Sequence, residues 1–394
     1  MNILFFTSTI PDSHIGGVEA VTRKLMQIFE RSGHQVYGIS KFPVQDSTCS
    51  VEKFVTFPEH SEWVASEKNI TFAKSFCEEK DIDIIINNAV HHEFVLLGNV
   101  LRSEKIKVIS CWHSASAILM ANIKDRFSGI LYNKGLTRCI QLLKFLMTLP
   151  VNLTSSRAWM QKKFYEMYKY SDACVLLSSA FIDEFVKIGR ISNSERIYAI
   201  PNPMELNTNI NTDNRKKAVL WLGRMEFEAK RPDRMLKIWR QVQANNPDWE
   251  LWMCGDGPAK ASLETYCIKR KIKNVKFCGK VNSSEIYPHV SIFCMTSSYE
   301  GFPMVIVESL SKHIPIIAFS SFATLFELCV NHKNSIFIPP FSIKRYAKEL
   351  DTLMRDSEKR QKLSSFDNSY LNKFSWETIG KQWENLFKKL KGEK

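Results

Sequence analysis

The sequence predicts an α/β protein with two domains, and three observations support this prediction. The chain has 394 residues, whereas a single hydrophobic core stops growing beyond about 250–300 residues. Short apolar runs of strand length alternate with longer stretches that have helical spacing, which is typical of parallel sheets joined by helices. The same alternation begins again after residue 217, so we expect one sheet in each half of the chain.

Composition excludes several classes of protein. Hydrophobic residues make up 44% and charged residues 24% of the chain, which is the balance of a folded globular protein rather than a disordered or fibrous one. No run approaches the roughly 18 apolar residues of a spanning helix, and the first residues carry no basic leader. The ten cysteines are scattered without a Cys-x-x-Cys motif, as in proteins of a reducing compartment. We therefore expect a cytoplasmic protein.

Residues 1–200 are predicted to form the first domain. An apolar strand at 2–6 precedes a loop and a helix at 18–31, in which apolar residues recur every three or four positions and which Gly33 ends. Further strand-like runs follow at 35–40, 82–86, 107–111 and 173–177.

Residues 201–217 are predicted to be a linker, and residues 218–375 a second domain of the same kind. Its expected strands are 218–222, 250–254, 275–278, 291–295, 314–319 and 335–338, and its expected helices are 232–244, 259–270, 305–311, 324–330 and 343–354. The last segment, 376–394, contains a helix with one apolar face. We expect this helix to pack back on the first domain.

Glycines and cations follow the first strand of each half. Gly16 and Gly17 precede the first helix, where backbone amides and the helix N-terminus could hold a phosphate, although a glycine pair is also common in plain turns. In the second half Gly223 and Arg224 follow a strand and Lys230 precedes a helix. Two fixed cations there could stabilise a departing diphosphate, or could belong to a solvated basic turn.

Two carboxylates are placed where both could face one ligand. Glu300 lies in a Gly/Pro loop and Glu308 lies inside the helix that this loop opens. Carboxylates bind sugar hydroxyls well, and the amides of residues 302–305 lie at a helix N-terminus suited to a phosphate or a developing charge. The alternative is that Glu300 caps the turn and Glu308 lies on a solvated face.

Taken in order, these motifs resemble the GT-B fold, retaining nucleotide-sugar glycosyltransferases of family four. The resemblance covers nearly the whole chain. It rests on Gly16-Gly17, His113, Gly223-Arg224 with Lys230, Gly255-Asp256-Gly257-Pro258, and the Glu-x7-Glu motif Glu300-Gly301-Phe302-Pro303 to Glu308. It implies two facing Rossmann-like domains with a cleft between them, an acceptor-binding first domain and a nucleotide-sugar-binding second domain.

The resemblance also implies roles for individual residues. Arg224 and Lys230 would hold the donor diphosphate, Glu300 would contact the transferred sugar, and Glu308 would contact the ribose. His113 would touch the sugar or shape the acceptor side, so the implied catalytic set is Glu300, Arg224, Lys230 and His113. The implied donor-binding residues are Gly16, Gly17, Gly223, Arg224, Lys230, Asp256, Lys280, Val281, Glu300, Gly301, Phe302, Pro303, Met304, Val305 and Glu308.

Three departures from the family pattern bear on the donor half. The gap from Arg224 to Lys230 is one residue longer than expected, Ser320-Ser321 stands in place of glycines, and residues 331–335 replace an acidic-glycine turn. The last two leave the donor's base and sugar open: a uridine diphosphate sugar is favoured, and guanosine diphosphate mannose remains an alternative.

Retention could arise by double displacement or by same-face substitution, and no residue is placed as an evident covalent nucleophile. The resemblance implies same-face substitution. We expect no metal, since no Asp-x-Asp or ligand-spaced His/Cys cluster occurs and adjacent His91 and His92 are badly placed to share one ion. We also expect no cofactor, because the nucleotide-sugar is a substrate.

The positive charge is concentrated in one segment. Residues 124–170 hold nine Lys or Arg against Asp125 and Glu166, interleaved with apolar residues. This composition fits a helix at an anionic membrane surface, or a helix pair with a solvated basic face. The resemblance implies surface-polysaccharide synthesis, and similar enzymes work at the cytoplasmic face of the membrane. We therefore expect a peripheral enzyme at that inner face, which acts on a saccharide or lipid-linked acceptor in lipopolysaccharide, O-antigen or capsule synthesis.

Other functions compatible with the sequence are an epimerase or a non-catalytic sugar-nucleotide sensor of the same fold. Nucleic-acid binding is not expected, because no helix-turn-helix, zinc or RNA-binding signature occurs.

Overall fold

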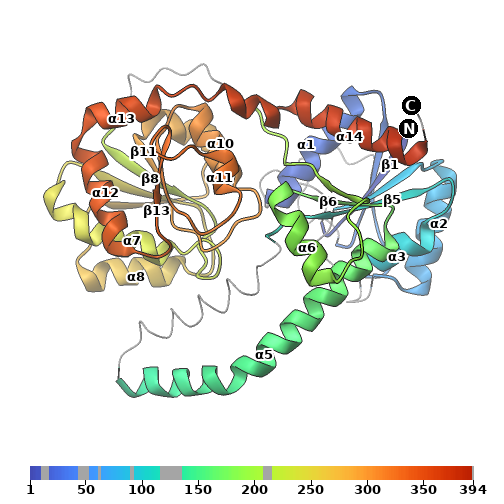
Figure 1. The fold of residues 1–394 in the computed structure, drawn as a ribbon, viewed down its shortest axis with the longest axis horizontal. Helices are drawn as coiled ribbons and strands as arrows, with labels where there is room; N and C mark the ends of the chain where they lie inside the picture. Colours follow the sequence, from blue (N-terminus) through green and yellow to red (C-terminus); the bar gives the residue numbers. More distant parts are fainter. Residues whose placement is uncertain are drawn as a thin grey trace. The chain divides into compact units, whose positions relative to one another are not determined.

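The computed structural model describes residues 1–9, 17–42, 53–60, 64–88, 93–115, 135–206 and 215–392. The chain divides into two compact units (Figure 1). Unit 1 comprises residues 1–116, 150–203 and 373–394, and unit 2 comprises residues 117–149 and 204–372. Each unit contains its own parallel sheet.

Unit 1 is built on a seven-stranded sheet with the order β3-β2-β1-β4-β5-β6-β7, in which every strand pair is parallel. The order shows that the chain first moves outward from β1 to β3 and then continues on the other side of β1. The strands are β1 (Asn2–Thr7), β2 (Gln35–Ser40), β3 (Phe54–Thr56), β4 (Ile84–Asn87), β5 (Lys107–Trp112), β6 (Ala173–Leu176) and β7 (Ile197–Ala199).

Helices connect these strands, as parallel pairing requires. The helices that follow strands of this sheet are α1 (Gly17–Arg31), α2 (Glu67–Glu79), α3 (Glu93–Leu101), α5 (Gly135–Tyr170) and α6 (Ile182–Gly189). Of α5, residues 150–170 belong to unit 1 and the preceding residues to unit 2. The side chains of residues 135–138, 141 and 147–153 within α5 lie outside the described set. None of the described helices is long and apolar enough to cross a bilayer.

A helix from the far end of the sequence completes unit 1. Helix α14 (Trp376–Lys391) begins at Ser375, whose hydroxyl accepts a hydrogen bond from the Thr378 amide. It packs against α1, with the Phe29 ring 5.7 Å from Trp383 and 5.1 Å from Phe387 between ring centroids. Such aromatic pairs contribute beyond their buried area, so α14 is part of the unit's core.

Unit 2 is built on a six-stranded parallel sheet with the order β10-β9-β8-β11-β12-β13. Its strands are β8 (Ala218–Leu222), β9 (Glu250–Cys254), β10 (Val275–Gly279), β11 (Ile292–Met295), β12 (Ile316–Phe319) and β13 (Ser335–Ile338). Its α-helices are α7 (Pro232–Val242), α8 (Lys260–Arg270), α9 (Ser283–Ile286), α10 (Met304–Ser311), α11 (Leu325–Leu328), α12 (Ile343–Arg355) and α13 (Ser357–Ser364).

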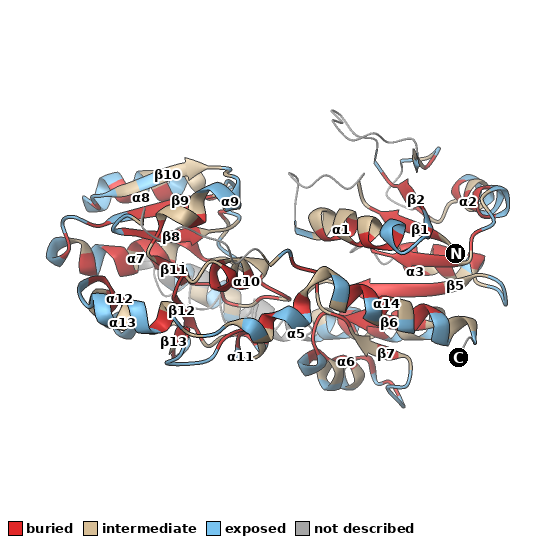
Figure 2. Cartoon of the chain, turned by 90° about the horizontal axis from the view of Figure 1, so that it is seen from above, coloured by how far each residue is buried: buried red, intermediate tan, exposed pale blue. Residues whose placement is uncertain are grey.

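The strands of both sheets form the centres of the two cores (Figure 2). Strands β4, β6, β11 and β12 are buried along their whole lengths, which is why they read as continuous apolar runs rather than as alternating ones. The prediction of an α/β protein with two parallel sheets is confirmed. Loops follow the carboxyl ends of the strands, and the polar side chains of a site can be placed there.

Candidate functional site

The sheet of unit 2 contains a topological switch point between β8 and β11. The chain leaves β8 toward β9 and β10 on one side, then returns to place β11 on the other side of β8. Ligands of open parallel sheets bind outside the carboxyl ends of strands at such a point. Gly223 and Arg224 directly follow β8, and residues 296–300 follow β11, so the fold brings the two predicted donor loops side by side.

Lys230 and Glu300 form an ion pair between these loops. The Lys230 Nζ lies 2.8 Å from Oε1 and 2.9 Å from Oε2 of Glu300. The Ser297 hydroxyl donates a further hydrogen bond of 2.7 Å to Oε1. Glu300 is 8% exposed, so its carboxylate is held in one place by a cation and a hydroxyl, as a buried charge must be.

Arg224 differs from Lys230 in its surroundings. Its side chain is 70% exposed, and its Nε lies 3.9 Å from the Glu226 carboxylate. A pair of this length at the surface contributes little to stability. The structure therefore brings Lys230 together with Glu300. It leaves the Arg224 side chain exposed to solvent.

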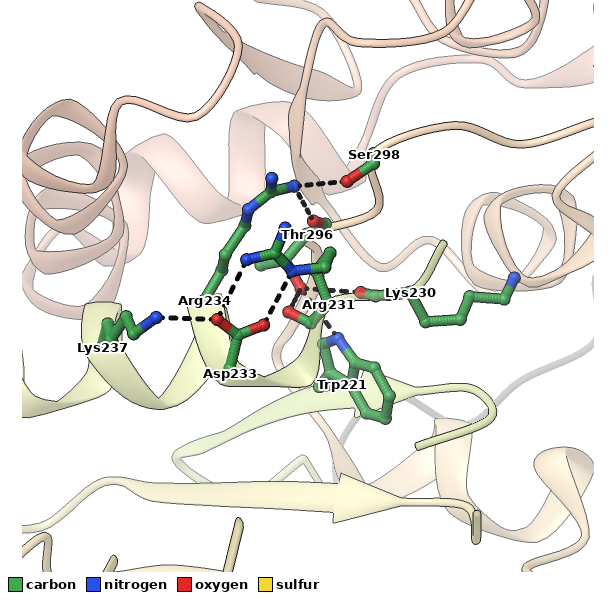
Figure 3. A network of polar contacts seen from close by, with 8 residues as sticks. All are labelled: Trp221, Lys230, Arg231, Asp233, Arg234, Lys237, Thr296 and Ser298. Atoms are coloured by element: carbon green, nitrogen blue, oxygen red, sulfur yellow. Dashed lines mark hydrogen bonds and ion pairs between the residues drawn. The ribbon is translucent and has the colours of Figure 1, made fainter. Parts of the chain in front are cut away.

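A network of polar contacts lies behind the ion pair and ties the two loops together (Figure 3). The Trp221 indole donates to the Thr296 hydroxyl at 3.0 Å, and that hydroxyl donates to the Arg231 carbonyl at 3.0 Å and lies 3.3 Å from the Lys230 carbonyl. The Lys230 side chain points away from this network in Figure 3. Its Nζ bonds the Glu300 carboxylate, which the figure does not draw. Thr296 thus fixes the backbone from which Lys230 extends.

Arg231 and Asp233 close the start of α7. Arg231 adopts a left-handed conformation with φ 51°, which is uncommon for a residue other than glycine. Its guanidinium bonds Asp233 at 2.9 and 3.2 Å, and Lys237 bonds the same carboxylate at 2.7 Å. Burial alone would raise the pKa of Asp233, but its bonds to these two cations outweigh burial and hold the pKa at about 2.

Arg234 connects α7 to the loop that carries Glu300. It is buried, and its Nη1 donates to the Ser298 hydroxyl at 2.8 Å and to the Thr296 carbonyl at 3.3 Å. Its guanidinium stacks over the Phe341 ring, 3.8 Å from the centroid. This arrangement fits the planar, multi-donor guanidinium and would not suit lysine.

Glycines allow the loop after β9 to approach the loop after β8. Gly255 has φ +125° and Gly257 has φ +154°. A Cβ on Gly255 would collide with the Gly223 carbonyl, and one on Gly257 would lie 2.5 Å from the Met225 carbonyl. These positions therefore need glycine both for their backbone conformation and for space.

Asp256, Lys280 and Val281 border the same edge of the sheet. Asp256 is exposed, and its carboxylate accepts a hydrogen bond of 2.8 Å from the Gly257 amide. Lys280 is exposed and Val281 is half-buried, directly after β10. No described contact joins them to Glu300. They therefore lie at the edge of the site, away from the Lys230–Glu300 pair.

The predicted helix N-terminus is present at α10, which begins at Met304 after Pro303. The first amides of a helix have no acceptor within it and carry its positive dipole end. Gly301 and Phe302 precede this turn, and Val305 belongs to it. The helix start predicted from the sequence is found, and anion binding there stays a prediction.

Glu308 lies one turn into α10 and is half-buried rather than fully solvated. The hydroxyl of buried Tyr287 donates to its Oε2 at 2.9 Å. Burial, with the neighbouring Glu308 charge, raises the pKa of Tyr287 well above its usual value, so this hydroxyl stays a donor. Glu308 is thereby oriented by a residue that the sequence did not single out.

Two of the departures from the family pattern have defined partners. The Ser321 hydroxyl donates to the Ser297 carbonyl at 2.8 Å, and the Asn331 side chain accepts from the Phe337 amide at 2.9 Å. Ser321 therefore supports the Glu300 loop. Asn331 thereby ties the turn before β13 to that strand.

In unit 1 the corresponding switch point lies between β1 and β4. Gly17 is the first residue of α1, whereas Gly16, His91 and His92 lie outside the described residues. His113 directly follows β5, and its Nε2 is 2.7 Å from Oδ1 of Asn88, which follows β4. Burial lowers the pKa of His113 to about 4, so the imidazole is neutral at physiological pH.

Sequence reasoning did not find Asn88, Ser297, Tyr287 or Arg234. Asn88 and Ser297 follow strands, and that position was a usable signal. Tyr287 and Arg234 lie within apolar patterns that gave no sign of a polar role. Within the described ranges, no group of three or more His, Cys, Asp or Glu side chains is arranged to hold a metal ion.

Comparisons with known proteins agree with this fold. The family model described as glycosyl transferases group 1 matches residues 205–367. An uncharacterized glycosyltransferase of Haemophilus influenzae is 27% identical over 172 residues, which are 43% of this chain and 48% of that protein, so this match spans about half of the relative. A Campylobacter jejuni protein is 23% identical over 82% of this chain and 94% of its own length. It is named GalNAc-alpha-(1->4)-GalNAc-alpha-(1->3)-diNAcBac-PP-undecaprenol alpha-1,4-N-acetyl-D-galactosaminyltransferase.

Among solved structures, Anabaena Alr3699/HepE in complex with UDP-glucose aligns with a TM-score of 0.74 and 15% identity over 99% of this chain and 100% of that one. At this identity the likeness establishes the fold. Residues 205–367 therefore match the glycosyl transferases group 1 family, and the fold of the chain is GT-B.

Proposed function

We propose that the protein is a retaining glycosyltransferase that moves a sugar from a nucleoside diphosphate sugar to a saccharide or lipid-linked saccharide in surface polysaccharide synthesis. The observation that carries this proposal is the Lys230–Glu300 pair at the switch point of unit 2. A diphosphate sugar presents an anion followed by a hydroxyl-rich ring, which matches a cation beside a carboxylate. The Anabaena structure with UDP-glucose favours a uridine diphosphate donor.

Three cationic features would hold the diphosphate. Arg224 is exposed, Lys230 lies between the loops, and α10 begins beside them at Met304, with the positive end of its dipole. Charge that develops on the leaving phosphate would meet groups already in position. Because these groups supply the positive charge, we propose that transfer needs neither a metal nor another cofactor, and activity in excess EDTA would check this.

For the mechanism we propose same-face substitution, in which the leaving phosphate takes the proton of the acceptor hydroxyl. The Glu300 carboxylate receives hydrogen bonds from Lys230 and Ser297, which lowers its nucleophilicity and suits it to bind sugar hydroxyls. Retention follows because the acceptor attacks from the face that the phosphate leaves. A covalent sugar trapped on Glu300, or a product with inverted configuration, would contradict this mechanism.

The donor site can be tested by thermal shift with uridine, guanosine and adenosine diphosphates and their common sugars. At a ligand concentration of 100 times Kd, binding stabilises by about 2.7 kcal/mol. Arg224→Ala removes a charge-assisted contact, and such a contact contributes about 1.5–3 kcal/mol, so binding should weaken roughly 10- to 100-fold. Glu308→Ala should weaken the binding of these nucleotides, because each of them carries a ribose.

The matched control is Arg345→Ala, which removes an exposed arginine from α12 of the same unit, outside the site. We expect unchanged nucleotide binding in this variant. If Arg224→Ala and Arg345→Ala bind nucleotides equally well, the donor site lies elsewhere. If Arg224→Ala loses nucleotide binding as expected but the unchanged protein transfers no sugar to membrane extracts, the sensor function is favoured over the transferase.

We also propose peripheral binding to an anionic membrane surface through α5. Ile140, Leu143 and Leu146 recur every three residues along this helix and are 58%, 62% and 51% exposed. Lys144, also exposed, lies among them. Apolar side chains with basic neighbours are what an interfacial helix presents to acidic lipid.

Liposome flotation would test this surface. The variant with glutamine at all three α5 positions should lose binding to vesicles that contain anionic lipid. Ile268→Gln, which changes an isoleucine 80% exposed on α8, should not. Recovery of the unchanged protein only in the soluble fraction would refute the proposal.

A further inference from the structure

A continuous chain of hydrogen bonds joins His113 to the first turn of α1. The His113 Nε2 is 2.7 Å from Asn88 Oδ1, and Asn88 Nδ2 donates to the Thr22 hydroxyl. The Thr22 hydroxyl donates to the Val18 carbonyl at 2.7 Å. Asn88 and Thr22 are each 1% exposed, so water does not compete for these bonds.

The direction of this chain is fixed at its far end. A hydroxyl has one proton, and Thr22 uses its proton on Val18. Its oxygen can then only accept from Asn88, so the Asn88 amide nitrogen faces Thr22 and its carbonyl oxygen faces His113. A carbonyl oxygen is an acceptor only, and Nε2 of His113 must therefore carry a proton.

We propose that Asn88 is a positioning residue that holds His113 as the Nε2–H tautomer, leaving Nδ1 as an acceptor for a hydroxyl group of the bound sugar. This inference rests on the proposed function for its ligand, but the tautomer itself does not depend on any ligand. Within the described ranges, no hydrogen bond occupies Nδ1.

The protonation state agrees with this arrangement. Burial lowers the pKa of His113 to about 4, so the ring is neutral and retains one acceptor nitrogen above that pH. An imidazolium would have two donors and no acceptor. An unprotonated Nδ1 can accept a hydrogen bond from a sugar hydroxyl. A protonated Nδ1 could only donate to the oxygen of that hydroxyl.

Nitrogen-15 NMR of the histidine rings in the full chain would test the tautomer without substrate, with His113→Gln used to assign the signals. In the unchanged protein at pH 7 we expect a protonated Nε2 and an unprotonated Nδ1. Asn88→Asp keeps an acceptor at the same place but adds a negative charge, which should raise the pKa of His113 by about 1–3. A His113 ring with the proton on Nδ1, or a pKa unchanged by Asn88→Asp, would overturn the proposal.

A second pair of variants acts one step further away and avoids the risk that Asn88 variants misfold. Thr22→Val is nearly isosteric but lacks the acceptor that orients the Asn88 amide, so the tautomers of His113 should mix. Thr22→Ser keeps the hydroxyl and should retain the spectrum of the unchanged protein. Equal spectra for Thr22→Val and Thr22→Ser would show that the chain of bonds does not set the tautomer.

Addition of UDP-glucose separates this inference from the proposed function. A change in the Nδ1 signal on saturation supports the hydroxyl contact, and saturation without any change overturns it. If the tautomer is found as expected but no nucleotide sugar binds, the proposed function fails while the role of Asn88 in setting the imidazole stands. If the protein transfers sugar but His113 has the proton on Nδ1, the proposed function stands and the role of Asn88 fails.

Discussion

The two partners of the Lys230–Glu300 pair should not be equivalent when one is removed. The Lys230 side chain is 26% exposed and that of Glu300 is 9% exposed. Lys230→Met therefore leaves a carboxylate buried with the Ser297 hydroxyl as its remaining described donor. Glu300→Gln leaves an ammonium that can still reach water, beside a neutral amide oxygen that can still accept from it.

The magnitudes follow from this asymmetry. Leaving a buried charge without its partner costs about 3–5 kcal/mol, and we expect about 3 kcal/mol for Lys230→Met because Ser297 remains. Glu300→Gln exchanges a charged hydrogen bond for a neutral one and should cost about 1 kcal/mol. In the double variant the buried charge is absent, so it should be more stable than Lys230→Met alone by about 1–2 kcal/mol.

Urea unfolding of the four proteins at pH 7, followed by circular dichroism, would measure these differences through the transition of unit 2. The matched control is Lys359→Met, which breaks a pair with Glu349 whose side chains are 31% and 35% exposed. That surface pair should contribute less than about 1 kcal/mol. Equal losses for Lys230→Met and Glu300→Gln, with additive effects in the double variant, would refute the reasoning.

Three further predictions concern stability. Asp233→Asn should cost about 2 kcal/mol at pH 7, because the folded pKa of about 2 lies below the ordinary aspartate pKa of 3.8. This contribution is complete above about pH 4 and is lost as the pH falls through 2, so the difference between the two proteins in denaturant titrations should be smaller at pH 3 than at pH 7. Gly255→Ala should abolish nucleotide binding and destabilise unit 2. Gly33→Ala, also at positive φ but with open space around it, should cost about 1 kcal/mol. The unfolding midpoints of the two variants and a thermal shift with nucleotide would measure this difference. Trp383→Ala, at a side chain that is 2% exposed against Phe29, should lower the free energy of unfolding of unit 1 by about 3–5 kcal/mol, and an unchanged unfolding midpoint would show that α14 is not part of its core.

Local patterns were enough to predict most elements. The strand at 218–222 and the helix ending at Arg31 are found where apolar spacing and turn residues placed them. The three-residue strands β3 (Phe54–Thr56) and β7 (Ile197–Ala199) were not predicted. They lie at the two edges of the sheet, where few apolar residues are needed and periodicity gives little signal.

Pairings between distant residues could not be predicted in the same way. Lys230 and Glu300 are 70 positions apart, and the contact between them depends on β11 lying beside β8. The bond of His113 to Asn88 likewise depends on the pairing of β5 with β4. The sequence indicated the residue types at these strand ends, but their distances follow from strand order.

The position of α14 in unit 1 has a consequence for the order of synthesis. Residues 376–391 are translated after all of unit 2, yet they cover Phe29 and Ile28 of α1. While the ribosome makes the second sheet, the first one still lacks the helix whose Trp383 and Phe387 pack against Phe29 in the finished protein. The nascent chain is thus expected to need either a chaperone on that surface or rapid translation, and a stop codon anywhere in unit 2 would leave unit 1 incomplete as well.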